Sequence, residues 1–409
     1  PDSTTVVWTP NMDGNQPTEN VTIPVGGAVT WRTRGLGTQV DAGWAQVICA
    51  QRISGFAVFR QSVPGRADQE AAVPMVSSWQ QRLLLPFDNT NNLVTSMAIS
   101  NVSESENGDV RAIFRDENGA IITGSFRRVL PPQGHTAFAM TDEFPFLRNR
   151  RGTAEFVMTG GRMSALGLRF AASAFTSFEV QSLNTASTGR LILPQIANAG
   201  GFFTTITLVN RDVAPASVTL RFFRRATADG ASEPWNPPMV NNQPVQNVTI
   251  PPGSSAVWQT TGTGDPAQGW AEVLTSQQVS GFAVFLQRVP GRVDQEAAVP
   301  VNAGEQRRFL LPFDNTPPFT TTMAIANTNE DSDALVVASL RDEANNTIIQ
   351  QVGFIVPRRG HLAFTLPERF PQSAGRRGTL EILTQFGYTS AIGLRFAGEA
   401  FTSFSPQVF

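Results

Sequence analysis

The chain has 409 residues, enough for two to four domains that each bury their own core. Only 16% of the residues are charged, and the 31 basic residues, all arginine, nearly balance 33 acidic ones to a net charge of −2. This balance excludes the basic footprint of a nucleic-acid-binding protein, and the lack of any apolar run of about 18 residues excludes a membrane-spanning helix.

An internal repeat organises the chain. Residues 43–47 (GWAQV) recur at 269–273 (GWAEV) with a spacing of 226 residues, and the same spacing relates His135 to His361. Matches that keep one spacing over most of a chain indicate a tandem duplication.

Each repeat divides into two related halves, A and B. Both kinds of half open on a run that ends in Leu-Pro, at 190–194 and at 308–312. The domain boundaries that follow, in chain order, are A1 (1–78), B1 (81–183), A2 (190–301) and B2 (307–409). The linkers are short and are not rich in glycine and serine, so we expect a semi-rigid rod of modules.

The local pattern predicts β-strands throughout. Val218, Leu220 and Phe222 alternate with polar residues, as in a half-buried strand. Residues 280–287 are apolar on both faces, which predicts a central strand. Turn signals such as 251–253 separate the strands every 8–14 residues, and no window shows a helical stripe. The prediction is an all-β fold of four tandem β-sandwich domains.

Domain A1 is predicted to be incomplete. The 43 residues that A2 carries at 184–226 have no counterpart in it, although Trp8 matches Trp235 and Trp31 matches Trp258. A sandwich without its first strands exposes apolar faces and unpaired sheet edges. Two explanations remain open: a chain that is longer at its N-terminus, or strands that another chain adds.

An arginine–carboxylate loop is the most prominent polar motif, and the repeat doubles it. Its residues are Arg66, Asp68 and Glu70 in A1, and Arg292, Asp294 and Glu296 in A2. An arginine with carboxylates two and four residues later can bind a ligand or pair with a neighbouring domain. A Pro-Gly turn with solvated charges is the structural alternative, which we favour. If the loops have a function, we expect them to make contacts between domains or between assembled chains.

Catalytic sites are weakly indicated. Asp88 and Glu155, repeated as Asp314 and Glu381, offer paired carboxylates for glycoside hydrolysis, but the sequence does not set their separation. No Gly-x-Ser-x-Gly motif is present. The two histidines each follow a turn glycine, so we expect them to pack in turns rather than to catalyse. No catalytic residue is predicted.

Metal and cofactor sites are not expected either. One cysteine and two histidines exclude an internal disulfide and a Cys/His zinc site. The acidic loops 103–109 and 327–333 offer oxygen ligands of the kind that calcium prefers, but we expect solvated hairpin tips. Cys49 is expected to be a buried, small apolar side chain.

The repeat resembles modules of large secreted bacterial proteins. The residues that carry the resemblance are the Leu-Pro opening, the turn IPPG at 250–253, the strand GWA and the strand SGFAVF at 280–285. The resemblance covers the whole chain and implies immunoglobulin-like β-sandwiches in an extracellular or cell-surface protein. Proteins of this type build adhesins, stalks and filaments. No catalytic residue is implied.

The resulting expectation is a non-enzymatic extracellular structural protein. It would be a subunit of a cell-surface filament, fibre or coat, and it would self-associate by strand complementation of the open A1 domain. The alternative is a surface adhesin or a carbohydrate-binding repeat array. Trp79, the one tryptophan without a repeat partner, would then be the first candidate for contact with a glycan.

Overall fold

The chain folds almost entirely into antiparallel β-sheets. The computed structural model describes residues 7–35, 40, 42–76, 79–183, 189–303 and 306–408. In this part of the chain the helical elements are short turns, and none of them is long and apolar enough to cross a membrane. The predicted all-β fold is confirmed at this level. The segment names A1, B1, A2 and B2 are kept below for the four residue ranges.

Segment B1 holds two sheets that face each other across an apolar core. Its elements are β3 (Arg82–Asp88), β4 (Leu93–Asn101), β5 (Gly108–Asp116), β6 (Ile121–Leu130), β7 (His135–Ala139), α1 (Met140–Glu143), η2 (Pro145–Leu147), β8 (Arg151–Thr159), β9 (Met163–Ala171), β10 (Ala174–Glu179) and β11 (Gln181–Ser182). The strand orders of the two sheets are β11-β3-β8-β5-β6 and β10-β9-β4-β7. This arrangement is typical of a β-sandwich.

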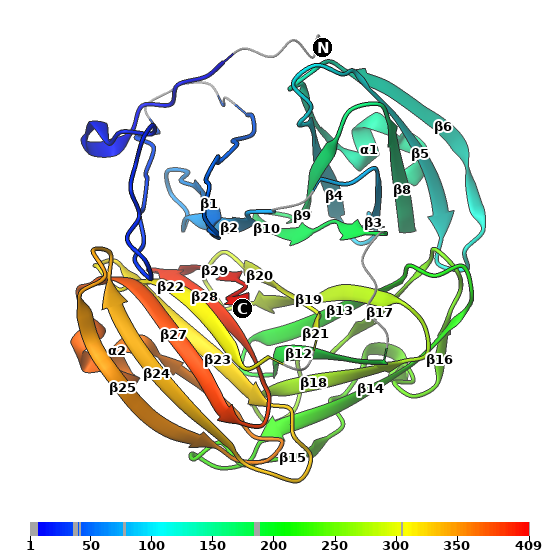
Figure 1. The fold of residues 1–409 in the computed structure, drawn as a ribbon. Helices are drawn as coiled ribbons and strands as arrows, with labels where there is room; N and C mark the ends of the chain where they lie inside the picture. The colour runs from blue at the N-terminus through cyan, green and yellow to red at the C-terminus, as the bar shows by residue number, and fades with distance from the viewer. Residues whose placement is uncertain are drawn as a thin grey trace.

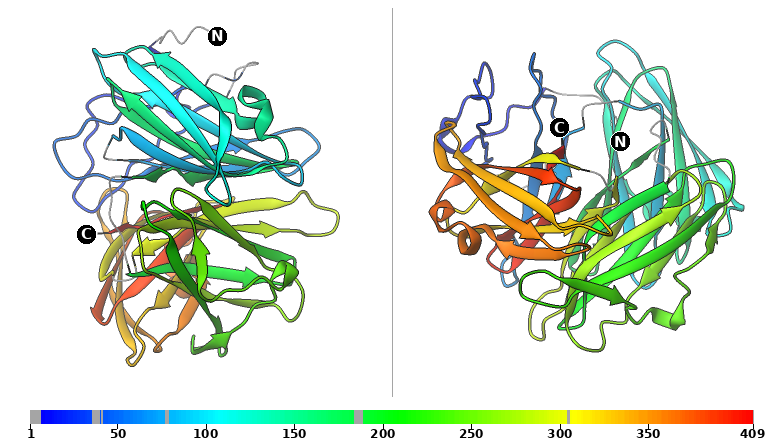
Figure 2. Two further views of the ribbon diagram at one scale, coloured as in Figure 1. Left: turned by 90° about the vertical axis from the view of Figure 1, so that its right-hand side faces the viewer. Right: turned by 60° about the horizontal axis from the view of Figure 1, so that its bottom comes forward.

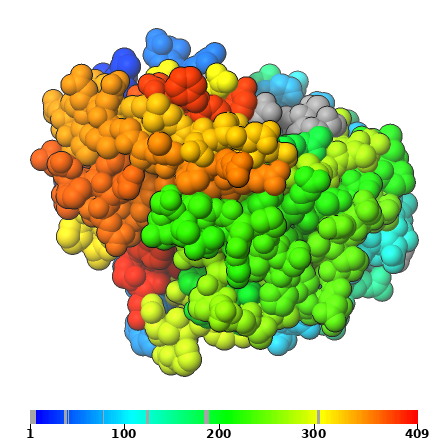
Figure 3. All heavy atoms as spheres, turned by 90° about the horizontal axis from the view of Figure 1, so that it is seen from below, coloured from blue at the N-terminus to red at the C-terminus, as the bar shows by residue number. Residues whose placement is uncertain are grey.

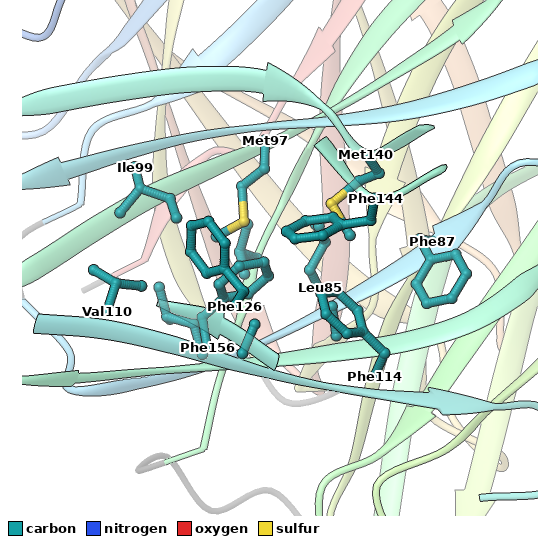
Figure 4. Close-up of a cluster of buried hydrophobic side chains, with 14 of the residues drawn as sticks. Leu85, Phe87, Met97, Ile99, Val110, Phe114, Phe126, Met140, Phe144 and Phe156 are labelled. Carbon is teal, nitrogen blue, oxygen red and sulfur yellow. The ribbon is translucent and has the colours of Figure 1, made fainter. Parts of the chain in front are cut away.

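The alternation of residues along each strand explains how the B1 core is filled. In β5, Val110, Ala112 and Phe114 are buried, whereas Ile113 is exposed on the other face. A period of two turns every second side chain toward the opposing sheet. Figure 4 shows the resulting cluster, which includes Leu85, Phe87, Met97, Ile99, Val110, Phe114, Phe126, Met140, Phe144 and Phe156.

Segment B2 repeats the plan of B1. Its elements are β22 (Arg308–Asp314), β23 (Phe319–Asn327), β24 (Ala334–Asp342), β25 (Thr347–Val356), β26 (His361–Thr365), α2 (Leu366–Arg369), η4 (Pro371–Ser373), β27 (Arg377–Phe386), β28 (Thr389–Ala397), β29 (Ala400–Phe404) and β30 (Gln407–Val408). The sheets are β25-β24-β27-β22-β30 and β26-β23-β28-β29. Strand register is repeated too, since Leu84 pairs with Glu155 and Leu310 with Glu381.

Segment A2 also encloses a core between two sheets. Its elements are β12 (Gly189–Asn198), β13 (Phe202–Asn210), β14 (Ala216–Arg225), β15 (Ser232–Trp235), η3 (Val240–Asn242), β16 (Val248–Ile250), β17 (Ser255–Gln259), β18 (Ala267–Thr275), β19 (Val279–Gln287), β20 (Gln295–Pro300) and β21 (Asn302–Ala303). The orders are β15-β14-β18-β12-β21, with β16 also on β14, and β17-β13-β19-β20. As predicted, residues 280–287 lie in a central strand, because β19 has a neighbour on each side.

Segment A1 contains far less regular structure than A2. Within its described residues, 7–35, 40 and 42–76, the strands are β1 (Phe56–Gln61) and β2 (Gln69–Pro74), which form one two-stranded sheet. The short turn η1 (Asp13–Asn15) is the other element. The strand that the sequence predicts at 43–47 is not formed, because the described residues of A1 include no counterparts of β12 and β14, which flank β18 in A2.

The four segments close into a ring. Figure 1 shows them in chain order around the centre, from blue A1 through cyan B1 and green A2 to orange and red B2. Strands β2, β10, β20 and β29, one from each segment, contact one another at the centre. The first segment therefore touches the last one, through β2 and β29.

The predicted rod of modules is therefore wrong. The side views in Figure 2 show a compact molecule, and in Figure 3 A2 and B2 meet along a continuous boundary. The reason is that the central strands carry apolar side chains, so that Phe178 of B1 stacks on Phe282 of A2 and Phe56 of A1 stacks on Phe404 of B2. Burial of such rings favours a closed arrangement over modules that are separated by solvent.

Candidate functional site

Two equivalent ion pairs join segments at the ring centre. Glu70 of A1 accepts a hydrogen bond from Arg395 of B2, and Glu296 of A2 pairs with Arg169 of B1 at 3.2 Å. Both glutamates are almost fully buried. Burial raises the pKa of Glu296, and the charge of Arg169 opposes this shift. These charges therefore hold neighbouring segments together.

Reciprocal contacts relate the two repeats at the same place. The Gln69 amide donates to the backbone oxygen of Asp294 at 3.3 Å, and the Gln295 amide donates to the backbone oxygen of Asp68 at 3.3 Å. Such an exchange, in which each partner contributes the same group, is characteristic of a twofold relation. The two repeats thus meet as the subunits of a symmetric dimer do.

The remaining residues of the arginine–carboxylate loops make local and intersegment contacts. Asp68 accepts from Arg60 at 2.7 Å within the β1–β2 hairpin, and Asp294 accepts from Arg288 at 3.2 Å within the β19–β20 hairpin. The other two contacts are Arg66 to the Gln61 side chain at 2.7 Å and Arg292 to Glu399 of B2 at 3.0 Å.

Sequence reasoning missed the arginines that pair with the buried glutamates. Arg169 and Arg395 lie inside strands β9 and β28, within the repeated pattern GLRFA. An arginine that is kept at one position of an apolar strand in both repeats is the signal that could have revealed these pairs. A buried arginine requires a carboxylate partner.

Three of the four carboxylates considered for catalysis are engaged by arginines on adjacent strands, and Asp314 accepts from Thr316 instead. Asp88 accepts from Arg151 at 2.8 Å, and Glu155 pairs with Arg82 at 2.5 Å. Glu381 of B2 pairs in the same way. Among the described residues there is no group of three or more His, Cys, Asp and Glu side chains that could hold a metal ion.

The histidines and Trp79 occupy different surroundings. His361 is completely buried, whereas His135 is partly buried. Burial first, and then the charge of Arg225, lower the pKa of His361 to about 3, while a hydrogen bond with the backbone of Pro194 acts in the opposite direction. Trp79 is exposed and lies under the guanidinium of Arg162, 4.8 Å from the ring centroid.

The open side of A1 is the outstanding feature of the surface. Apolar side chains of A1 are exposed where their counterparts in A2 are buried. The exposed fractions are 37% for Trp31 and 1% for Trp258, 51% for Val47 and 0% for Val273, and 48% for Phe59 and 2% for Phe285. Exposed apolar side chains that a complete segment buries indicate an interaction site.

The expectation that the thiol of Cys49 is buried is wrong, and the comparison with A2 gives the reason. Cys49 is exposed. Its counterpart Thr275 lies in β18, which is flanked by β12 and β14. Among the described residues of A1, no such neighbours cover the corresponding positions.

One backbone edge of A1 is also open. In A2, β19 pairs with β20 on one side and with β13 on the other. Its counterpart β1 pairs with β2, and the described residues of A1 provide no strand on the other side. The unpaired amide and carbonyl groups of such an edge can accept a further strand.

The loops of A1 nevertheless have the conformation of those in A2. The indole of Trp31 donates to the Pro17 carbonyl at 2.8 Å, as the indole of Trp258 donates to that of Pro244 at 2.8 Å. The isolated bridge between residues 12 and 33 likewise repeats the bridge between 239 and 260. This part of A1 is therefore already arranged as in a complete segment.

A1 also contacts its neighbouring segments in the ring in the same way as A2 does. Trp44 donates to the backbone oxygen of Gln133 in B1 at 2.9 Å, just as Trp270 donates to that of Arg359 in B2 at 2.9 Å. On its other side, Gly26 accepts from Thr379 of B2 at 2.6 Å. A1 is thus held in place on both sides while its outer face is open.

No protein-family model, curated protein or solved structure matches this chain. The comparison of A1 with A2 within the same molecule is therefore the basis for assigning a site. It identifies the open edge of β1 and the exposed apolar residues around Trp31 and Val47 as the candidate interaction site, which we call the A1 face.

Proposed function

We propose that this chain is a non-enzymatic structural protein of the cell surface or extracellular space, a subunit of a filament, fibre or coat. Its subunits join their neighbours through the A1 face by β-strand complementation. The observation that supports this is the open edge of β1 beside apolar side chains that A2 buries. An unpaired edge next to apolar surface is the usual acceptor in strand addition.

The ring supports a structural role as well. Contacts between β2 and β29 tie the last segment to the first, so the A1 face is presented by a rigid body rather than by a flexible end. A rigid acceptor loses little conformational entropy when a strand binds. The resemblance to secreted bacterial repeat proteins is what supports the extracellular location.

We also propose that the four segments are immunoglobulin-like sandwiches. In B1, β4 pairs with β7 and β5 pairs with β8. These pairings correspond to B with E and C with F of the immunoglobulin fold. Strand β3 lies beside β8, where that fold has its last strand, so the likeness concerns the inner strands.

Self-association tests this function. Sedimentation velocity of the full chain over a range of concentrations should show species that grow with concentration, and electron microscopy should show regular assemblies. Phe59→Asp places a charge on the A1 face and should shift the chain to monomers. Ile121→Asp, which changes an exposed apolar residue of B1, is the matched control and should assemble normally. A chain that is monomeric at every concentration, or equal assembly by both variants, would contradict the proposal.

A further inference from the structure

We infer that the A1 face is the acceptor for a polypeptide segment with the residue pattern of 189–225 in A2, which fills the places of β12, β13 and β14. The inference names the partner of the site on which the proposed function rests. Four observations support it. They are the open space beside two glycines of A1, the strand pairing of the matching part of A2, the position of the vacant strands, and one substitution between A1 and A2.

The glycines of A2 show what the missing strands require. A Cβ atom on Gly269 would lie 1.9 Å from the backbone oxygen of Phe223 in β14. A Cβ atom on Gly281 would lie 2.0 Å from the backbone oxygen of Thr207 in β13. Real Cβ atoms do not approach other atoms so closely, so glycine is required at both positions when β13 and β14 are in place.

A1 has glycine at both corresponding positions without any such neighbour. Around Gly43, no heavy atom of the described chain lies within 4 Å of the position of an added Cβ. Around Gly55, the nearest such atom is the methyl carbon of Met75 at 3.3 Å. Glycine at these two positions leaves room for the backbones of two neighbouring strands, which the described residues of the chain do not provide.

The register of the incoming segment follows from A2. There β13 runs antiparallel to β19, with Thr204 opposite Phe285 and Ile206 opposite Ala283. Phe59 and Ala57 are the counterparts of Phe285 and Ala283. A donated strand should therefore run antiparallel to β1, with its residue at the Ile206 position opposite Ala57.

The vacant place begins beside the end of B2. In B1, β11 pairs with β3 and ends at Ser182, and β12 begins soon afterwards at Gly189. In B2, β30 pairs with β22 in the same register. By the relation between the repeats, the start of the missing β12 lies only a few residues of chain away from β30, so a donated segment would enter from that side.

One substitution specifies the chemistry of the donor. Glu272 of A2 is buried and binds two arginines of the strands in question, Arg190 and Arg221. Its counterpart in A1 is Gln46, which carries no charge. Arg190 and Arg221 are partly exposed, but both converge on this one carboxylate, and the neutral Gln46 could not neutralise two arginines at these places. The donor is therefore a segment with apolar residues at the core positions and neutral polar residues at the places of Arg190 and Arg221.

A binding experiment with the full chain tests this inference. The probe is a synthetic peptide of residues 184–226 in which Arg190→Gln and Arg221→Gln are introduced. We expect a complex of one peptide per chain and a blue shift of tryptophan emission, because Trp31 becomes buried as Trp258 is. The unchanged peptide should bind the chain at least about tenfold more weakly, and Gln46→Glu in the chain should restore its affinity.

Variants of the acceptor complete the test. Gly43→Val should leave the fold of the free chain intact and abolish peptide binding. Gly353→Val is the matched control, because Gly353 in β25 is likewise an exposed glycine with open space around it. In a second form of the experiment, residues 184–226 with the same two changes are appended after Phe409, so that peptide insolubility cannot prevent binding. The same burial of Trp31 is expected, again abolished by Gly43→Val.

The outcomes separate this inference from the proposed function. Binding of the segment by a chain that never self-associates would support the acceptor and contradict self-assembly. Self-association of a chain that takes up neither the peptide nor the appended segment would overturn the acceptor. Binding that is unaffected by Gly43→Val would also overturn it, because the segment would then lie elsewhere.

Discussion

At the scale of single residues, His361 shows how closely A2 and B2 meet. The side chain is completely buried, and its backbone amide donates to the backbone oxygen of Gly230 in A2 at 2.8 Å. Burial first, and then the charge of Arg225, lower the pKa of His361 to about 3 from an ordinary value of 6.5. A neutral histidine is thus built into the contact between these two segments.

This pKa predicts a loss of stability in acid. Between pH 6.5 and pH 3 the unfolded chain binds a proton at His361 that the folded chain does not, so the free energy of unfolding decreases as the pH falls. The expected slope is about 1.4 kcal/mol per pH unit. Denaturant unfolding of the chain and of His361→Leu at pH 6.5 and pH 4.5 measures it.

The variant should lose less stability than the parent over this range. His135→Leu serves as the comparison: burial also lowers the pKa of His135, but this side chain of B1 is only partly buried, so a smaller effect is expected. Equal acid sensitivity of the parent and His361→Leu would show that His361 is charged in the folded protein.

At the scale of elements, the sequence predicts strands well where their neighbours are present. The alternation in Val218, Leu220 and Phe222 corresponds to buried positions of β14, and the apolar run 280–287 corresponds to central β19. The same reasoning fails for residues 43–47, whose pattern matches that of β18. A strand is formed by its neighbours as well as by its own residues, and an isolated one is not stable in water.

The two glycines of this pattern give a matched prediction. Gly269→Ala should destabilise A2 by at least about 2 kcal/mol, because its Cβ would collide with the backbone of β14. Gly43→Ala should leave the stability of the chain unchanged, because the space around it is open. Thermal unfolding of both variants measures the difference. Equal destabilisation would mean that A1 already has a strand beside Gly43.

At the scale of the whole molecule, the repeat was evident from the sequence but the ring was not. Short linkers indicate a rod. The prediction fails because the length of a linker says nothing about the contacts that the modules make with one another. The closure depends on side chains that are remote in sequence, such as Glu70 with Arg395 and Phe56 with Phe404. Only the arrangement in space shows that the loops with Glu70 and Glu296 lie between segments.

The ring also fixes the position of the incomplete segment A1. A1 is held between B1 and B2 by contacts that match those of A2, so the missing strands leave one defined opening in an otherwise repeated structure. The sequence alone shows that residues 1–78 contain no counterpart of residues 184–226. The place and register that we propose for a donated segment come only from the comparison of A1 with A2.

Hydrogen–deuterium exchange of the full chain tests the role of the A1 face most directly. The amides of residues 42–50 should exchange rapidly in the chain alone. After addition of the modified 184–226 segment they should become as slow as those of Ala267–Thr275 in β18, because they would then lie between two strands. Residues 42–50 that are protected without the segment, or that still exchange rapidly with it, would contradict the assignment of A1 as a strand acceptor.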